Sequence, residues 1–104
     1  MLNNLANEIV EINKANGWDV TIPEDWPNAV YKLGTLLALI HSEVSEALEA
    51  LRHQDRTNFE EELADALIRI LGFAGGLRID MDTVVNKKLE KNKKRGFKHG
   101  GKAV

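Results

Sequence analysis

Cysteine is absent from the sequence, so disulfide bonds and thiolate metal sites are excluded. A chain without cysteine also suits the cytoplasm. Long hydrophobic runs are absent too, because the longest uncharged stretch, "LGTLLALIHS", has about half of the ~20 residues that a membrane-spanning helix needs. The first residues lack the basic start and the long apolar run of a signal peptide. The 104 residues therefore predict one cytoplasmic domain that does not enter a membrane.

The net charge is only −2, but it is distributed unevenly along the chain. Residues 87–102 contain eight basic residues and one acidic residue, whereas the remainder contains six basic and fifteen acidic residues. Such a basic segment is typical of a solvated helix end or of an arm that binds nucleic acid. Phe97 is its one aromatic residue, which disfavours stacking on bases, so we do not expect a nucleic-acid partner.

Strands are not indicated, since no useful length of the sequence alternates between apolar and polar residues. Apolar residues instead recur every three or four positions, which is the spacing of helices buried on one side. The predicted class is all-α, a four-helix bundle that occupies residues 1–104 as one domain, with a basic tail from about residue 96 that can be flexible. The predicted helices cover residues 4–16, 27–52, 57–77 and 81–95.

Residues with strong positional preferences mark where three of these helices begin. Pro27 suits the first turn of the second helix. Thr57 and Glu60 have the spacing of a capping box at the start of the third helix. Asp80 or Asp82 is expected to cap the fourth. The turn before the third helix is then short, which favours an antiparallel pair of helices.

The third predicted helix is apolar over more than half of its circumference. A helix of that kind must be buried on more than one side. In so short a chain, a second copy is the expected cover, so the sequence predicts a homodimer or a homotetramer.

Two pairs of acids lie beside the apolar faces of neighbouring predicted helices. With Leu33 set at 0°, the apolar stripe of the second helix spans roughly 300° through 60°, and Glu43 falls at about 280° with Glu46 behind it. The third helix places Glu62 and Asp65 on one flank in the same way. Antiparallel packing would bring the two pairs face to face.

Four carboxylates in one cleft repel each other strongly enough to threaten the fold, so protons or cations must neutralise them. Alternatively, the pairs splay apart, or Arg69 and the lysines neutralise them. Carboxylate oxygens without histidine or thiolate partners favour Mg²⁺ or Mn²⁺. The pattern therefore predicts a site for a hard divalent cation.

The basic segment could bind the same anionic ligand as such a cation. Lys88, Asn92 and Arg95 lie at positions i, i+4 and i+7, which share one face of a helix. Two cations and an amide in a row could hold a polyphosphate. A solvated basic helix end, stabilised by the helix dipole, is the alternative.

Three sequence blocks together resemble a known family. "SEVSEALEALR", "EELADALIRIL" and "IDMDTVVNKKLEKNKKRGFKHG" are similar to the all-α nucleoside triphosphate pyrophosphohydrolases, and within them to the MazG-like and dCTP pyrophosphatase branch. The family pattern is E-x-x-E, a spacer, E-x-x-D and then Lys-x-x-x-Asn-x-x-Arg. The resemblance covers residues 36–99 well and the N-terminal third only loosely.

The resemblance implies hydrolysis of a nucleoside triphosphate, such as dCTP or a modified dNTP, by attack of water on the α-phosphorus. The products would be the monophosphate and pyrophosphate. Glu46, which lies further from the apolar stripe than Glu43, is expected also to position or deprotonate the water. Arg69, which replaces a tyrosine of some relatives, would contact phosphate or neutralise Asp65. The residues implied to bind Mg²⁺ and to act in catalysis are Glu43, Glu46, Glu62 and Asp65.

Base recognition in this family uses aromatic residues from the N-terminal loop and the end of the second helix. By resemblance, Trp18, Asn13 and His53 would contact the base, and Trp26 is a further candidate. His53 stands where dCTP-specific members carry an aromatic residue, so specificity for cytosine is not implied. For both tryptophans, a structural role at the end of the bundle is an equal alternative. The competing interpretation of the whole chain is a basic helical dimer that binds nucleic acid or nucleotides without catalysis.

Overall fold

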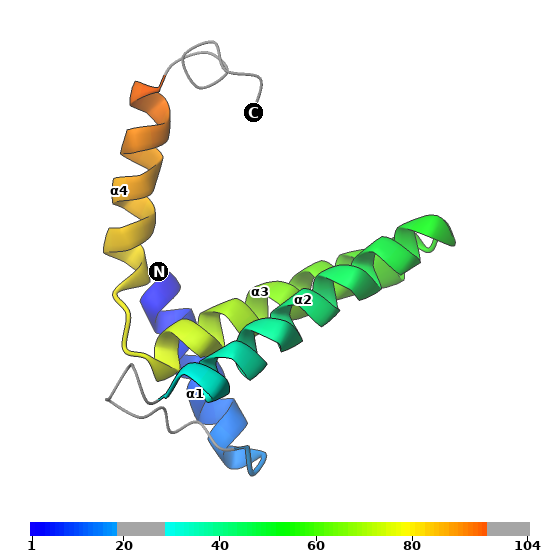
Figure 1. The fold of residues 1–104 in the computed structure, drawn as a ribbon, viewed down its shortest axis with the longest axis horizontal. Coiled ribbons are helices and arrows are strands. Elements are labelled where there is room, and N and C mark those ends of the chain that lie inside the picture. The colour runs from blue at the N-terminus through cyan, green and yellow to red at the C-terminus, as the bar shows by residue number, and fades with distance from the viewer. Residues whose placement is uncertain (19–28, 96–104) are drawn as a thin grey trace.

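The computed structural model describes residues 1–18 and 29–95, and within these residues the chain is all-helical. No strand occurs in the described ranges, which confirms the predicted class. None of the helices there is long and apolar enough to cross a membrane. Pro27, Trp26 and the tail from residue 96 lie outside the described residues. The helices are α1 (Leu2–Ala15), α2 (Val30–Arg52), α3 (Arg56–Gly76) and α4 (Met81–Lys94) (Figure 1).

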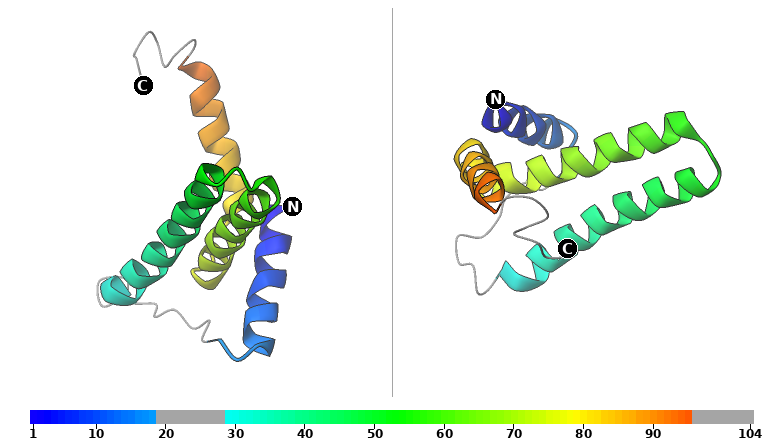
Figure 2. Two further views of the ribbon diagram at one scale, coloured as in Figure 1. Left: turned by 90° about the vertical axis from the view of Figure 1, so that its right-hand side faces the viewer. Right: turned by 90° about the horizontal axis from the view of Figure 1, so that it is seen from above.

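Helices α2 and α3 form a long antiparallel hairpin (Figures 1 and 2). Gln54 closes α2 with a φ of 56°, a left-handed conformation. Its N–H donates to the Leu51 carbonyl at 3.0 Å, and the Asp55 N–H donates to the Ala50 carbonyl at 3.0 Å. This is the pattern of a Schellman motif, which reverses the chain within a few residues. The antiparallel pairing expected from the short turn is therefore confirmed.

The start of α3 differs from the sequence prediction. Asp55 is the N-cap, and its carboxylate accepts a hydrogen bond from the Asn58 N–H at 3.1 Å. The predicted capping box of Thr57 and Glu60 is wrong, because the helix already begins at Arg56 and Thr57 lies within its first turn. Glu60 instead accepts a hydrogen bond from Arg56 Nε at 2.6 Å. An aspartate placed directly after the turn caps the helix before the threonine is reached.

Helix α1 packs on the C-terminal half of α3. Ile9 of α1 and Leu71 of α3 are both buried in the same apolar cluster. The approach is close at Gly75, where an added Cβ would lie 2.9 Å from Val10 Cγ2 and 3.1 Å from the Ala6 carbonyl oxygen. Gly75 is therefore a contact position between two helices, in addition to standing near the end of α3.

The first turns of α1 and α4 cap each other. Asp82 accepts hydrogen bonds from the Leu2 N–H at 2.8 Å and the Asn3 N–H at 3.3 Å. In return, Asn3 Oδ1 accepts from the Met81 N–H at 2.8 Å and the Asp82 N–H at 3.3 Å. Asp80 is the N-cap of α4, as one of the two predicted candidates, and accepts from the Thr83 N–H at 3.1 Å. Side chains distant in sequence thus satisfy backbone donors at both helix starts.

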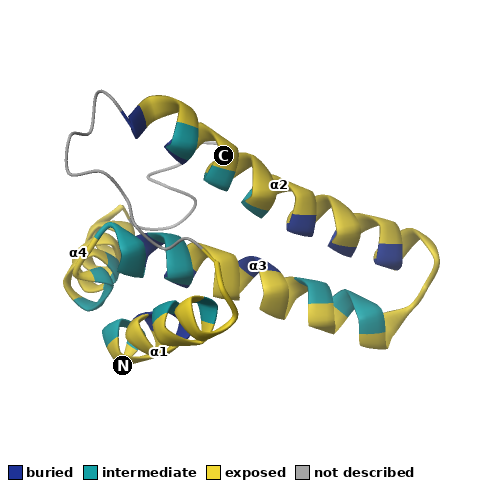
Figure 3. Ribbon diagram, turned by 90° about the horizontal axis from the view of Figure 1, so that it is seen from below, coloured by how far each residue is buried: buried dark blue, intermediate teal, exposed yellow. Residues whose placement is uncertain are grey.

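The side of α2 that faces α3 is rotated from the predicted apolar stripe. Glu43 and the alanines that face α3 are buried, as the dark blue positions of α2 in Figure 3 show. Val44, Leu48 and Leu51 belong to the predicted core stripe, yet they are 54%, 49% and 58% exposed. The hairpin therefore covers one edge of the stripe, the edge on which Glu43 lies, and leaves the other edge open.

Candidate metal centre

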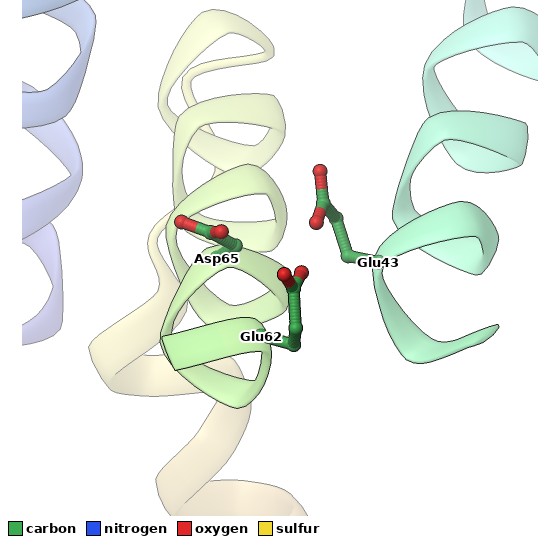
Figure 4. A group of neighbouring side chains, drawn as sticks. All are labelled: Glu43, Glu62 and Asp65. Atoms are coloured by element: carbon green, nitrogen blue, oxygen red, sulfur yellow. The ribbon is translucent and has the colours of Figure 1, made fainter. Parts of the chain in front are cut away.

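Three carboxylates from the two helices of the hairpin meet. Glu43 on α2 and Glu62 and Asp65 on α3 each offer one oxygen atom, and these atoms all lie within 4.8 Å of one another. Figure 4 shows Glu43 reaching toward α3, on which Glu62 and Asp65 are one turn apart. Their i, i+3 spacing places both acids on one side of α3. The antiparallel hairpin supplies the third acid.

Exposure increases across the cluster. Glu43 is 8% exposed and is the one buried charged residue in the described part of the chain. Glu62 is partly buried and Asp65 is exposed. The cluster is thus enclosed at Glu43 and open to solvent at Asp65.

Arg69 is the nearest cation to the enclosed acid. Its Nε donates a hydrogen bond to Glu43 Oε1 at 2.7 Å. This bond holds the pKa of Glu43 below its ordinary value of 4.5, against the opposing effect of burial. The sequence placed Arg69 on the correct flank of α3, but its ion-pair partner is Glu43 and not Asp65.

Glu62 has the opposite electrostatic situation. The neighbouring carboxylate of Glu46, burial and the carboxylate of Glu43 raise the pKa of Glu62 to about 7. Its Oε2 atom is buried, and no hydrogen-bond partner among the described residues reaches it. A proton or a cation on this atom would relieve the repulsion from the two neighbours.

Glu46 is the fourth predicted acid. It is exposed on α2 and does not belong to the group of three. The Glu46 carboxylate is nevertheless the largest cause of the raised pKa of Glu62, and it also lowers the pKa of Glu43. The hairpin therefore brings three of the four predicted acids together, and Glu46 is an exposed neighbour on α2.

The donor set fits a hard divalent cation. Every candidate ligand atom in the cluster is a carboxylate oxygen. Such oxygens suit Mg²⁺ and Mn²⁺, whose remaining coordination positions are taken by water or phosphate. The buried Oε2 of Glu62, which lacks a donor, is the atom for which a cation would be the natural partner.

The predicted phosphate ligands on α4 are not brought to this cluster within one chain. Lys88, Asn92 and Arg95 are exposed. Helix α4 starts beside α1 and leads away from the α2–α3 hairpin, as Figure 1 and the left panel of Figure 2 show. The direction of α4 is set by its junction with α1, which the residue spacing on α4 could not reveal.

The predicted base-binding residues lie at two places. The Trp18 N–H donates a hydrogen bond to the Asn13 carbonyl at 2.9 Å, so these two residues adjoin at the end of α1. Trp18 follows α1 and is 70% exposed, while the Asn13 amide packs against Gly72 of α3. His53 lies at the tip of the hairpin, where its Nε2 is 2.9 Å from Glu49 Oε1. The described part of the chain does not bring these three side chains together.

Comparison with known proteins agrees with this fold and cluster. The all-α chain presents a candidate divalent-cation site on an antiparallel helix pair. Residues 32–99 match the model of the MazG nucleotide pyrophosphohydrolase domain, so the chain belongs to this family. The match includes all of α3 and α4 and all but the first two residues of α2, and with them the four predicted acids. No curated protein and no solved structure shows a significant match.

Proposed function

We propose that this chain is a Mg²⁺-dependent nucleoside triphosphate pyrophosphohydrolase that cleaves a (d)NTP to the monophosphate and pyrophosphate, as a housekeeping enzyme of the nucleotide pool. The observation that supports the proposal best is the gathering of Glu43, Glu62 and Asp65 within 4.8 Å in a member of the MazG family. The buried Glu62 Oε2, which has no hydrogen-bond partner in the described residues, adds a reason for a cation at this place.

The four acids have two tasks in this proposal. Glu43, Glu62 and Asp65 would hold Mg²⁺, with Mn²⁺ as a possible substitute. The bound ion would supply positive charge that neutralises and orients the triphosphate. Glu46, exposed beside Glu62, would accept the proton of the attacking water. The water oxygen then bonds to the α-phosphorus while the bond to the bridging oxygen breaks, and pyrophosphate leaves.

A homodimer or homotetramer is part of the proposal. On both helices of the hairpin, large apolar side chains remain exposed on the flank opposite to the acids, at helical angles of about 40–100° from the buried residues Ala47 and Ala66. An apolar face of this extent is typical of an interface between subunits. Its members are Leu37, Val44, Leu48, Leu51, Leu63, Leu67 and Ile70.

The phosphate-binding role of α4 depends on that assembly. Helix α4, which carries Lys88 and Asn92 and is followed directly by Arg95, leads away from the hairpin of its own chain (Figure 1). To hold a triphosphate at the cluster, they must belong to another copy whose α4 lies near it. Sedimentation or light scattering tests the assembly directly, and a monomer at micromolar concentration would contradict this part of the proposal.

The activity itself is tested with a panel of nucleotides. The protein is incubated with each dNTP and Mg²⁺, and pyrophosphate release is measured. We expect release from at least one nucleotide, loss of release with EDTA, and loss in Glu43→Gln while circular dichroism shows an intact helical fold. Variants of Trp18, Asn13 and His53 then test base recognition through KM.

The exposure of the basic helix α4 favours one competing function, which is binding of nucleic acid or nucleotides without catalysis. The same panel separates the two. Salt-dependent binding of DNA, without cleavage of any dNTP, would replace the hydrolase proposal.

A further inference from the structure

We infer that Arg69 is the internal counter-ion of the carboxylate cluster and that it competes with the divalent cation for Glu43. The inference rests on the proposed function, because it assumes that Glu43 is a metal ligand. Its structural basis is the bond of 2.7 Å between Arg69 Nε and Glu43 Oε1, which joins α3 to α2 across the hairpin.

The exposure of the two partners is unequal. The Glu43 side chain is 11% exposed, whereas the Arg69 side chain is 42% exposed. A carboxylate removed from water needs a positive partner, since an unpaired buried charge is strongly destabilising. The arginine, in contrast, can turn toward solvent and keep its charge hydrated. Glu43 is therefore fixed in the pair, and Arg69 is the partner that can leave.

A divalent cation at the cluster would take over the role of Arg69. It supplies positive charge to Glu43 and repels the guanidinium at the same time. Binding of the cation is then an exchange of one positive group for another. The affinity of the cluster for the cation is lowered by the strength of the ion pair that must be broken.

The position of Arg69 on α3 keeps the displaced guanidinium close to the site. Arg69 is four residues after Asp65 and seven after Glu62, so all three share one side of the helix. This is the open side of the cluster, where a phosphate group would arrive. Guanidinium groups bind phosphate oxygens through paired donors, so the displaced side chain finds a new anionic partner there.

The test measures cation binding without nucleotide and therefore does not depend on activity. Mn²⁺ binding is followed by calorimetry for the wild type, Arg69→Gln and Arg69→Lys. The matched control is Arg56→Gln, which removes the same charge from the same helix and breaks an exposed pair with Glu60. The free protein is also unfolded thermally in EDTA.

Removal of the Arg69 charge should strengthen cation binding and lower the stability of the metal-free protein. We expect Arg69→Gln to bind Mn²⁺ about tenfold more tightly than the wild type, because a charge in contact with Glu43 is lost. Its melting temperature in EDTA should be lower than that of the wild type. Arg56→Gln should bind Mn²⁺ like the wild type, and Arg69→Lys should lie between the wild type and Arg69→Gln.

Four results would overturn the inference. Equal or weaker Mn²⁺ binding by Arg69→Gln, with binding by the wild type intact, rejects the competition and leaves the proposed function standing. If Arg56→Gln strengthens Mn²⁺ binding as much as Arg69→Gln does, the effect comes from the net charge of the protein and Arg69 has no specific role. If Arg69→Gln does not fold, Arg69→Lys decides, and binding no tighter than that of the wild type rejects the competition. Absence of Mn²⁺ binding in the wild type would reject the metal site and the inference together.

Discussion

Asn3 of α1 accepts a hydrogen bond from the backbone at the start of α4, and Asp82 of α4 accepts one from the backbone at the start of α1. The pair ties α1 to α4 and is one of the contacts that hold α4 in its direction away from the hairpin. Since α4 carries the proposed phosphate ligands, the geometry of this junction bears on substrate binding as well as on stability.

Loss of the Asn3 side chain tests the junction. We expect Asn3→Ala to lower the free energy of unfolding by about 1–2 kcal/mol, because the N–H groups of Met81 and Asp82 lose their acceptor. Denaturation by urea measures the change. Asn7→Ala is the control, since Asn7 is an exposed residue within the same helix. Equal effects of the two substitutions would contradict a capping role for Asn3.

The raised pKa of Glu62 predicts an unusual pH dependence in the metal-free protein. With a pKa of about 7 in the folded chain and an ordinary value of 4.5 when unfolded, the folded state binds the extra proton between these two pH values. Stability should therefore fall as the pH rises from about 4.5 to about 7, and then level off. Melting temperatures in EDTA across this range measure the effect.

Glu62→Gln removes the titrating group and should flatten that part of the profile. Mg²⁺ should act in the opposite direction, because it binds the ionised carboxylate and its affinity rises with pH through the same window. A profile in which Glu62→Gln follows the wild type would show that another group is responsible.

Two glycines provide a matched pair of substitutions. Gly75→Ala should destabilise the protein by about 1–3 kcal/mol, because the new methyl group would overlap Val10 and the Ala6 carbonyl across the α1–α3 contact. Gly34 lies in α2, and an added Cβ there meets nothing within 4 Å. Gly34→Ala should therefore stabilise the chain by about 0.5–1 kcal/mol through helix propensity. Opposite signs in urea denaturation confirm the close approach of α1, and equal signs contradict it.

Asp65 tests catalysis at the open end of the cluster. Asp65→Asn keeps the shape of the side chain but removes the charge, so we expect kcat for pyrophosphate release to fall by about 100-fold or more. The melting temperature in EDTA should stay the same or rise, because repulsion among the acids decreases. Glu61→Gln, an exposed neighbour outside the cluster, should retain activity. A fully active Asp65→Asn would remove this residue from the proposed site.

The gathering of the acids could be predicted because it depends on local rules. Their i, i+3 spacing fixes the flank on each helix, and a short turn forces the helices to run antiparallel. The prediction of a capping box at Thr57 was wrong for an equally local reason, because Asp55, two residues earlier, is the N-cap of α3. The correct antiparallel pairing and the wrong capping box both concern residues that are close together in the sequence.

Features that depend on distant contacts could not be predicted. The partner of Arg69 is decided by how α2 is rotated against α3, and the helical spacing of α3 alone does not contain that angle. The direction of α4 depends on its junction with α1, which includes Asn3 and Asp82, 79 positions apart. The placement of the predicted phosphate ligands away from the acids follows from that junction.

The gradient of exposure from Asp65 to Glu43 gives the cluster an entrance and a closed end. A hydrated ion diffusing in would meet Asp65 with its water shell whole and could reach Glu43 only after shedding water on that side. Exchange of the ion with solvent should therefore be limited by the exchange of water at the Glu43 carboxylate. Mg²⁺, which exchanges its water ligands more slowly than Mn²⁺, should then leave and enter the site more slowly.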